Sequence, residues 1–112
     1  MTRAEQRLLG PVIKAVIGAC PDSWNRLKYE IFNYGNQSFY PAQSDFYPHV
    51  DRLMDRFDEP TRVALVEAWL AAKPRRRNLS DGEILMAYRA MIIESIVQRA
   101  AAAAYRSNEL EL

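Results

Sequence analysis

The chain contains few of the residues that build metal sites and catalytic sites. It has one cysteine, Cys20, and one histidine, His49, in 112 residues. A single cysteine cannot form an internal disulfide, so folding does not depend on an oxidising compartment. A metal site requires several histidine, cysteine or clustered carboxylate ligands, and Cys20 lies far from His49 and has no CxxC partner. We therefore expect no bound metal, and we interpret Cys20 as a small buried hydrophobic residue.

Glycine and long apolar runs are also scarce. The four glycines are dispersed, so no glycine-rich phosphate-binding motif is present. No apolar run approaches the roughly 20 residues that a membrane-spanning helix needs. The N-terminal apolar stretch is interrupted by Gly10-Pro11 and by Lys14, which is unlike a signal peptide. These absences favour a cytoplasmic protein that is not an enzyme, holds no cofactor and does not contact a membrane.

Neither sign of charge is in excess. Lys and Arg number 15 and Asp and Glu number 14, for a formal net charge of +1. The chain as a whole therefore has no electrostatic preference for nucleic acid. The composition, 49% hydrophobic and 26% charged, is ordinary for a globular protein. A chain of this length can bury one hydrophobic core, and we predict a single domain over residues 1–112.

Most of the chain has the periodicity of amphipathic helices. The first predicted helix follows a capping box at Thr2–Glu5, continues through Pro11 and stops at Pro21. A second capping box, Ser80–Glu83, marks the start of the last one. This last helix covers Asp81–Tyr105, and two more are predicted over His49–Phe57 and Thr61–Ala72.

The period changes between Trp24 and Tyr40. Leu27, Tyr29 and Ile31 alternate with charged residues, which is the period of two of a half-buried strand. Gly35 lies in a turn-forming segment and can adopt a positive φ. We therefore predict an antiparallel β-hairpin over Trp24–Tyr40 and an α+β fold that is mostly helical. The alternative is a helix from Asp22 to Asn33, which would make the fold all-α.

Acidic residues are concentrated between positions 45 and 59. They form either a solvated helix face or a negative patch that meets a basic partner. The loop Lys73–Arg77 is the basic counterpart, but it lacks the interleaved aromatic residues typical of single-stranded nucleic-acid sites. The acidic residues of the predicted patch are Asp45, Asp51, Asp55, Asp58 and Glu59.

Aromatic residues are dense between positions 29 and 47. They cannot all face one core, so some are either covered by helices or exposed to a partner. Exposed tyrosines are common anchors at protein interfaces. Combined with the acidic patch, they give the candidate partner-binding residues Tyr34, Tyr40, Asp45, Tyr47, Asp51, Asp55, Asp58 and Glu59.

The first half of the chain resembles the YezG-like immunity proteins. The matching pieces are a leading helix, Pro21-Asp22-Ser23-Trp24, the alternation Leu27–Ile31, Gly35 and Phe39-Tyr40-Pro41. Small cytosolic domains without an active site are typical of immunity proteins, including those of contact-dependent growth inhibition. The resemblance implies a one-to-one complex with a cognate toxin domain, often a nuclease, whose active site is blocked. Nucleases bind phosphates through basic surfaces, so an acidic patch would suit one.

Two alternatives remain open at this point. The first is a small helical nucleic-acid-binding or regulatory domain that uses Arg75, Arg76 and Arg77, whereas an immunity protein would not contact nucleic acid directly. The second concerns assembly, because the alanine-rich segment Ala100–Ala104 could pack closely against another helix and form a homodimer.

Overall fold

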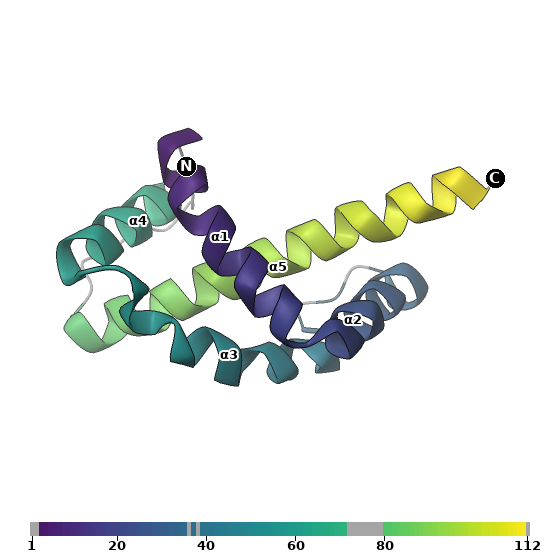
Figure 1. Cartoon of the computed structure of the whole chain (residues 1–112), viewed down its shortest axis with the longest axis horizontal. Helices are drawn as coiled ribbons and strands as arrows, with labels where there is room; N and C mark the ends of the chain where they lie inside the picture. The colour runs from purple at the N-terminus through teal and green to yellow at the C-terminus, as the bar shows by residue number, and fades with distance from the viewer. Residues whose placement is uncertain (1–2, 36, 38, 72–79, 112) are drawn as a thin grey trace.

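All regular structure is helical in residues 3–35, 37, 39–71 and 80–111, the part of the chain that the computed structural model describes (Figure 1). The α+β prediction is therefore wrong, and the all-α alternative agrees with the structure. The elements in chain order are α1 (Arg3–Ala19), α2 (Pro21–Tyr34), the 3₁₀ helix η1 (Pro41–Phe46), α3 (Tyr47–Arg52), the 3₁₀ helix η2 (Met54–Arg56), α4 (Glu59–Ala71) and α5 (Asp81–Glu111).

Helix α2 occupies most of the stretch that we predicted to be a hairpin. Pro21 lies in its first turn, where the missing backbone N–H costs no hydrogen bond. Leu27 and Ile31 are one helical turn apart and both buried, whereas Tyr29 between them is 60% exposed. The alternation in the sequence therefore came from two core residues at helical spacing and one aromatic residue on the solvent side.

Gly35 ends α2 with a backbone conformation that glycine adopts easily. Its φ is 67° and its N–H donates to the carbonyl of Ile31 at 3.1 Å. Gln37, Phe39 and Tyr40, which belonged to the predicted return strand, have no regular structure. Pro41 begins η1.

Helix α5 is the central element of the fold. Its 31 residues give a length of about 46 Å at 1.5 Å per residue, close to the 45 Å longest dimension of the molecule. In Figure 1 α1 crosses α5, α4 lies beside its N-terminal part and α2 beside its C-terminal half. Helices α1 to α4 and η1 all contact α5, so the core forms along its length.

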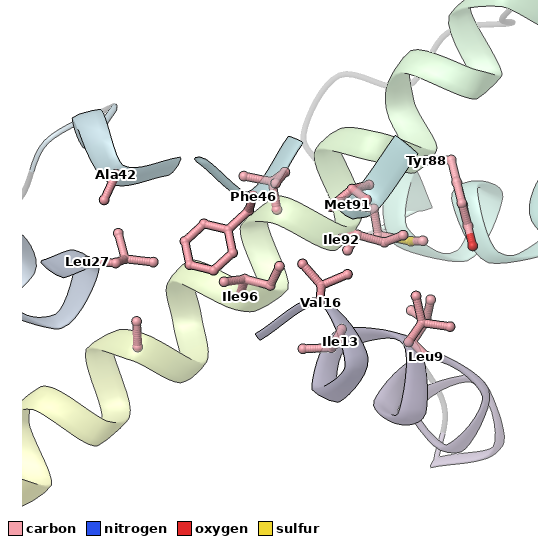
Figure 2. Close-up of a cluster of buried hydrophobic side chains, with 14 of the residues drawn as sticks. Leu9, Ile13, Val16, Leu27, Ala42, Phe46, Tyr88, Met91, Ile92 and Ile96 are labelled. Atoms are coloured by element: carbon pink, nitrogen blue, oxygen red, sulfur yellow. The ribbon is translucent and has the colours of Figure 1, made fainter. Parts of the chain in front are cut away.

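The core consists of buried residues at helical spacing from α1, α2 and α5, together with residues of η1, α3 and α4. Figure 2 shows Phe46 of η1 between Leu27 of α2 and Ile96 of α5. Tyr88 lies at one end of this cluster. The largest fully buried side chains are Tyr88, Phe46, Leu9, Leu27, Leu65, Met91, Ile92, Ile96, Val16, Val50 and Val66.

Several predicted helix boundaries agree with the structure. The Ser80–Glu83 capping box forms, with the Glu83 N–H donating to the Ser80 hydroxyl at 3.4 Å. The predicted helix His49–Phe57 is instead divided into α3 and η2. The N-terminal capping residue Thr2 and the basic loop Lys73–Arg77 lie outside the described residues.

Candidate partner-binding site

An open groove of about 650 Å³ runs between five residues in and around η1 and one side of α5. We call it the η1–α5 groove. The residues that form its α5 wall recur at helical spacing, so they lie on one face of that helix. These residues are Met86, Arg89, Ala90, Ile93, Glu94 and Val97. The opposite wall consists of Gln37, Phe39, Tyr40, Gln43 and Tyr47.

The groove has an apolar floor and exposed apolar side chains at its rim. Tyr40 and Ile93 are each 6% exposed and form part of the floor. Phe39 is 46% exposed and Met86 64% exposed, although both are large and apolar. Concave apolar surfaces with a few polar groups are the usual form of binding sites.

Tyr40 fixes the wall that faces α5. Its hydroxyl donates to the carbonyl of Gly35, and its backbone N–H donates to Oε1 of Gln43. The backbone N–H of Gln37 donates to the Tyr40 hydroxyl at 3.4 Å. Tyr40 therefore connects the end of α2 to the start of η1, and its burial gives it a supporting role rather than an exposed contact.

Tyr47, Arg89 and Asp51 form one connected group at the groove. The guanidinium of Arg89 lies 4.3 Å from the centroid of the Tyr47 ring, within the range of a cation–π interaction. The same guanidinium donates to Oδ2 of Asp51 at 3.0 Å. Asp51 does not line the groove, but through Arg89 it fixes a side chain that does.

Asp45 takes part in a polar network between α2 and η1. Its carboxylate accepts a hydrogen bond from the Ser23 hydroxyl at 3.0 Å and lies 3.6 Å from Arg26. Arg26 also lies 3.2 Å from Glu30. Glu30 is buried, and its other oxygen accepts the Ala42 N–H at 2.9 Å. Asp45 therefore stabilises the position of η1 against α2.

The other predicted acidic residues lie around the start of α4. Asp55 pairs with Arg62 at 3.4 Å. Asp58 caps α4 by accepting the Thr61 N–H at 3.0 Å, and hydrogen bonds from Thr61 lower the pKa of its carboxyl group. Glu59 is exposed and lines a small hollow with Arg62. None of the three lines the groove.

The structure thus brings only part of the predicted site together. Tyr40 and Tyr47 line the groove, and Asp51 is tied to it. Tyr34 is 56% exposed at the end of α2, where its ring meets Tyr29 edge-on at 6.4 Å. The acidic residues do not form an unpaired patch, because Asp45, Asp51 and Asp55 each contact an arginine of another helix.

The candidate residues named from the sequence include none of the α5 wall and omit Phe39, although Phe39 belongs to the aromatic stretch between positions 29 and 47. A signal was present in α5, since Met86, Ala90, Ile93 and Val97 recur at intervals of three or four residues. This is a second apolar stripe beside the one that contains Tyr88, Ile92 and Ile96. A helix with two such stripes has more apolar surface than one core face needs.

Other kinds of site find little support in the described part of the chain. No three histidine, cysteine or carboxylate side chains there are placed to hold a metal ion. No helix there combines the length and the apolar character needed to cross a bilayer. Searches of protein-family models, of curated proteins and of solved structures found no match to this chain.

Proposed function

We propose that this chain is a non-enzymatic immunity protein that binds a bacterial toxin domain one-to-one in the cytoplasm, with the η1–α5 groove as its main contact. The observation that carries the proposal is the open groove with Phe39 and Met86 exposed at its rim. The resemblance to YezG-like proteins supports the toxin as partner through the residue pattern alone, because most of the matching stretch, Pro21–Tyr34, forms the helix α2 instead of the predicted strand.

The groove has the composition of a protein-binding surface. Aromatic residues and methionine are enriched in the centre of interfaces, where they exclude water. Methionine also adapts its shape to a partner because its side chain is unbranched and flexible. Gln37, Gln43 and the Arg89 guanidinium add hydrogen-bonding groups around the apolar part. A helix or loop of the toxin that places an apolar side chain between Phe39 and Met86 fits this arrangement.

The charges of the chain shift the proposed contact away from the acidic region. Asp45, Asp51 and Asp55 are each balanced by an arginine. A basic nuclease surface would therefore meet less negative potential there than the sequence predicts. We place the main contact at the groove, and the acidic residues adjust its orientation.

Co-purification with the toxin encoded by the adjacent gene tests the proposal. Phe39→Glu and Met86→Glu introduce a charge at exposed positions, so they should leave the fold intact and weaken binding by at least about tenfold. Leu8→Glu is the matched control, because Leu8 is 45% exposed on α1 and does not line the groove. Loss of toxin neutralisation by the two groove variants alone is the expected result.

Two results would reject the proposal. If the wild-type pair does not associate at low salt, the chain is not the immunity protein of that toxin. If Leu8→Glu weakens binding as much as Phe39→Glu does, the groove is not the contact surface. Circular dichroism of each variant identifies any that fail to fold.

A further inference from the structure

Basic side chains form a row along the exposed side of α1. Arg3, Arg7 and Lys14 are all exposed. At 100° per residue they fall within about 40° of one another around the helix axis, and at 1.5 Å per residue the row is about 16 Å long. We call these residues, together with Arg99 described next, the basic row.

Arg99 of α5 fills the gap in this row. Gly10 lies between Arg7 and Lys14 on the same side of α1. Helix α1 crosses α5 (Figure 1). A Cβ atom at Gly10 would be 3.9 Å from Nη2 of Arg99, so the guanidinium lies against this glycine. Arg106 is exposed about two turns further along the same side of α5.

The basic row has no acidic partner among the described side chains. The structure shows no ion pair there for Arg3, Arg7, Lys14 or Arg99, in contrast to the paired arginines of α2, α4 and α5. Glu94 is five residues from Arg99, which places it about 140° away around α5. Its carboxylate accepts the indole N–H of Trp69 in α4 at 3.1 Å. A net charge of +1 therefore does not exclude a local row of basic side chains without acidic partners among the described residues.

The surroundings of the row are polar and contain little apolar surface. A hollow of about 190 Å³ between α1 and α5 is lined by Gln6, Ser95, Gln98 and Arg99, with Leu9 and Ile13 below. Leu8, the exposed apolar residue of α1, is about 120° away from the row around the helix axis. This surface therefore differs in chemistry from the η1–α5 groove.

The row and the groove also lie on opposite sides of α5. Ala90 lines the groove, and Arg99 is nine residues later, which is two and a half turns. One partner in the groove would leave the row accessible. An inference about the row therefore does not depend on the proposed immunity function, and it departs from the expectation that such a protein does not contact nucleic acid directly.

We propose that the basic row binds the phosphate backbone of a nucleic-acid duplex, without sequence-specific base contacts. Arginine presents planar N–H groups that match phosphate oxygens, and serine and glutamine are frequent partners of phosphate and sugar. Successive phosphates of one strand are spaced 3.4 Å apart along the axis of a duplex. A row of about 16 Å therefore faces about five of them.

Other polyanionic partners fit the row less well. Single-stranded sites need aromatic side chains on which bases stack, and the row contains none. Membrane-surface helices bury a broad apolar face, which the exposed side of α1 does not offer. Protein interfaces depend on aromatic or other large anchors, which the row also lacks.

Fluorescence anisotropy with a labelled 20-base-pair duplex of mixed sequence tests the proposal. We expect the duplex to bind at 50 mM salt. A plot of the logarithm of the binding constant against the logarithm of the salt concentration should have a slope of about −3 to −4, for four phosphate contacts. Arg7→Gln with Arg99→Gln should reduce the slope by about 2 and weaken binding at 50 mM salt by at least about tenfold. Arg52→Gln with Arg56→Gln is the control, because it removes the same charge from exposed positions of α3 and η2.

The proposal is overturned if the wild-type protein does not bind the duplex at 50 mM salt, or if both double variants lose the same affinity. It is also overturned if a single-stranded oligonucleotide, a polyglutamate peptide or phosphatidylserine vesicles bind more tightly than the duplex. Phe39→Glu should bind the duplex as the wild type does. This comparison keeps a failure of the basic row separate from a failure of the groove.

Discussion

Tyr88 is a buried phenol whose hydroxyl group has no hydrogen-bond partner among the described residues. An unpaired buried hydroxyl costs about 1–3 kcal/mol relative to its hydration in the unfolded chain. Tyr88→Phe keeps the ring and removes the hydroxyl, so it should raise the free energy of unfolding by about 1 kcal/mol. Tyr40→Phe is the comparison, because it loses the bond to the Gly35 carbonyl and should lower that free energy by about 1 kcal/mol.

The same phenol should lower the stability of the fold at alkaline pH. Burial raises the pKa of Tyr88 above the ordinary value of about 10, and the positive charge of Arg62 opposes this only in part. The unfolded chain therefore ionises first, and the contribution of Tyr88 to stability is lost as the pH rises from about 10 through the folded-state pKa. Urea unfolding at pH 8 and pH 11 should show the advantage of Tyr88→Phe widening. An advantage that is constant or shrinks would contradict the burial of the phenol.

At the scale of the helix, two glycines should respond oppositely to the same substitution. Gly10 is inside α1, and an added Cβ would meet Arg99 at an ordinary contact distance of 3.9 Å. Gly10→Ala should raise the free energy of unfolding by about 0.5–1 kcal/mol, since alanine favours helix. Gly35→Ala should lower it by about 1–3 kcal/mol, because φ 67° and ψ −145° are accessible almost only to glycine. Thermal unfolding of both variants checks the sign, and a stabilised Gly35→Ala would show that α2 ends differently.

The helix boundaries that could be predicted from the sequence are those marked by local chemistry. Ser80 and Glu83 cap α5, and Asp58 caps α4. These caps can be predicted because each hydrogen bond joins residues only three positions apart. Helix α2 was mistaken for a strand because six residues are too few to separate a period of two from Leu27 and Ile31 at helical spacing. The difference depends on burial of Leu27 and Ile31 against η1 and α5, which the local sequence does not contain.

At the scale of the whole molecule, the charge pattern illustrates the same limit. The acidic residues are clustered in the sequence, but the arginines that pair with them come from α2, α4 and α5. The residues of the basic row, in contrast, are far apart in the sequence and meet only in the fold. Arg99 lies against Gly10 of α1, although it is 85 positions after Lys14. Both surfaces depend on which helices cross, so composition and local spacing could not predict either one.

The contacts of α1 to α4 and of η1 with α5 predict one cooperative unfolding transition. Ile96 is fully buried in α5 beside Phe46 and Leu27 (Figure 2). Ile96→Ala should lower the free energy of unfolding by about 2–5 kcal/mol, through lost burial and the cavity that remains. Trp24 in α2 and Trp69 in α4 are natural fluorescence probes. Trp69→Phe leaves the signal of Trp24 alone, and Trp24→Phe leaves that of Trp69 alone.

Urea unfolding of the Ile96→Ala variant in these two backgrounds should show the same midpoint for both tryptophans and for the helical circular dichroism signal, because two-state unfolding makes all probes coincide. Tyr105→Ala is the control, since Tyr105 is 50% exposed on α5 and its loss should change stability by less than about 0.5 kcal/mol. If the substitution lowers the Trp24 midpoint and leaves the Trp69 midpoint in place, α2 and α4 unfold separately. In that case α5 joins two independent helical contacts rather than one core.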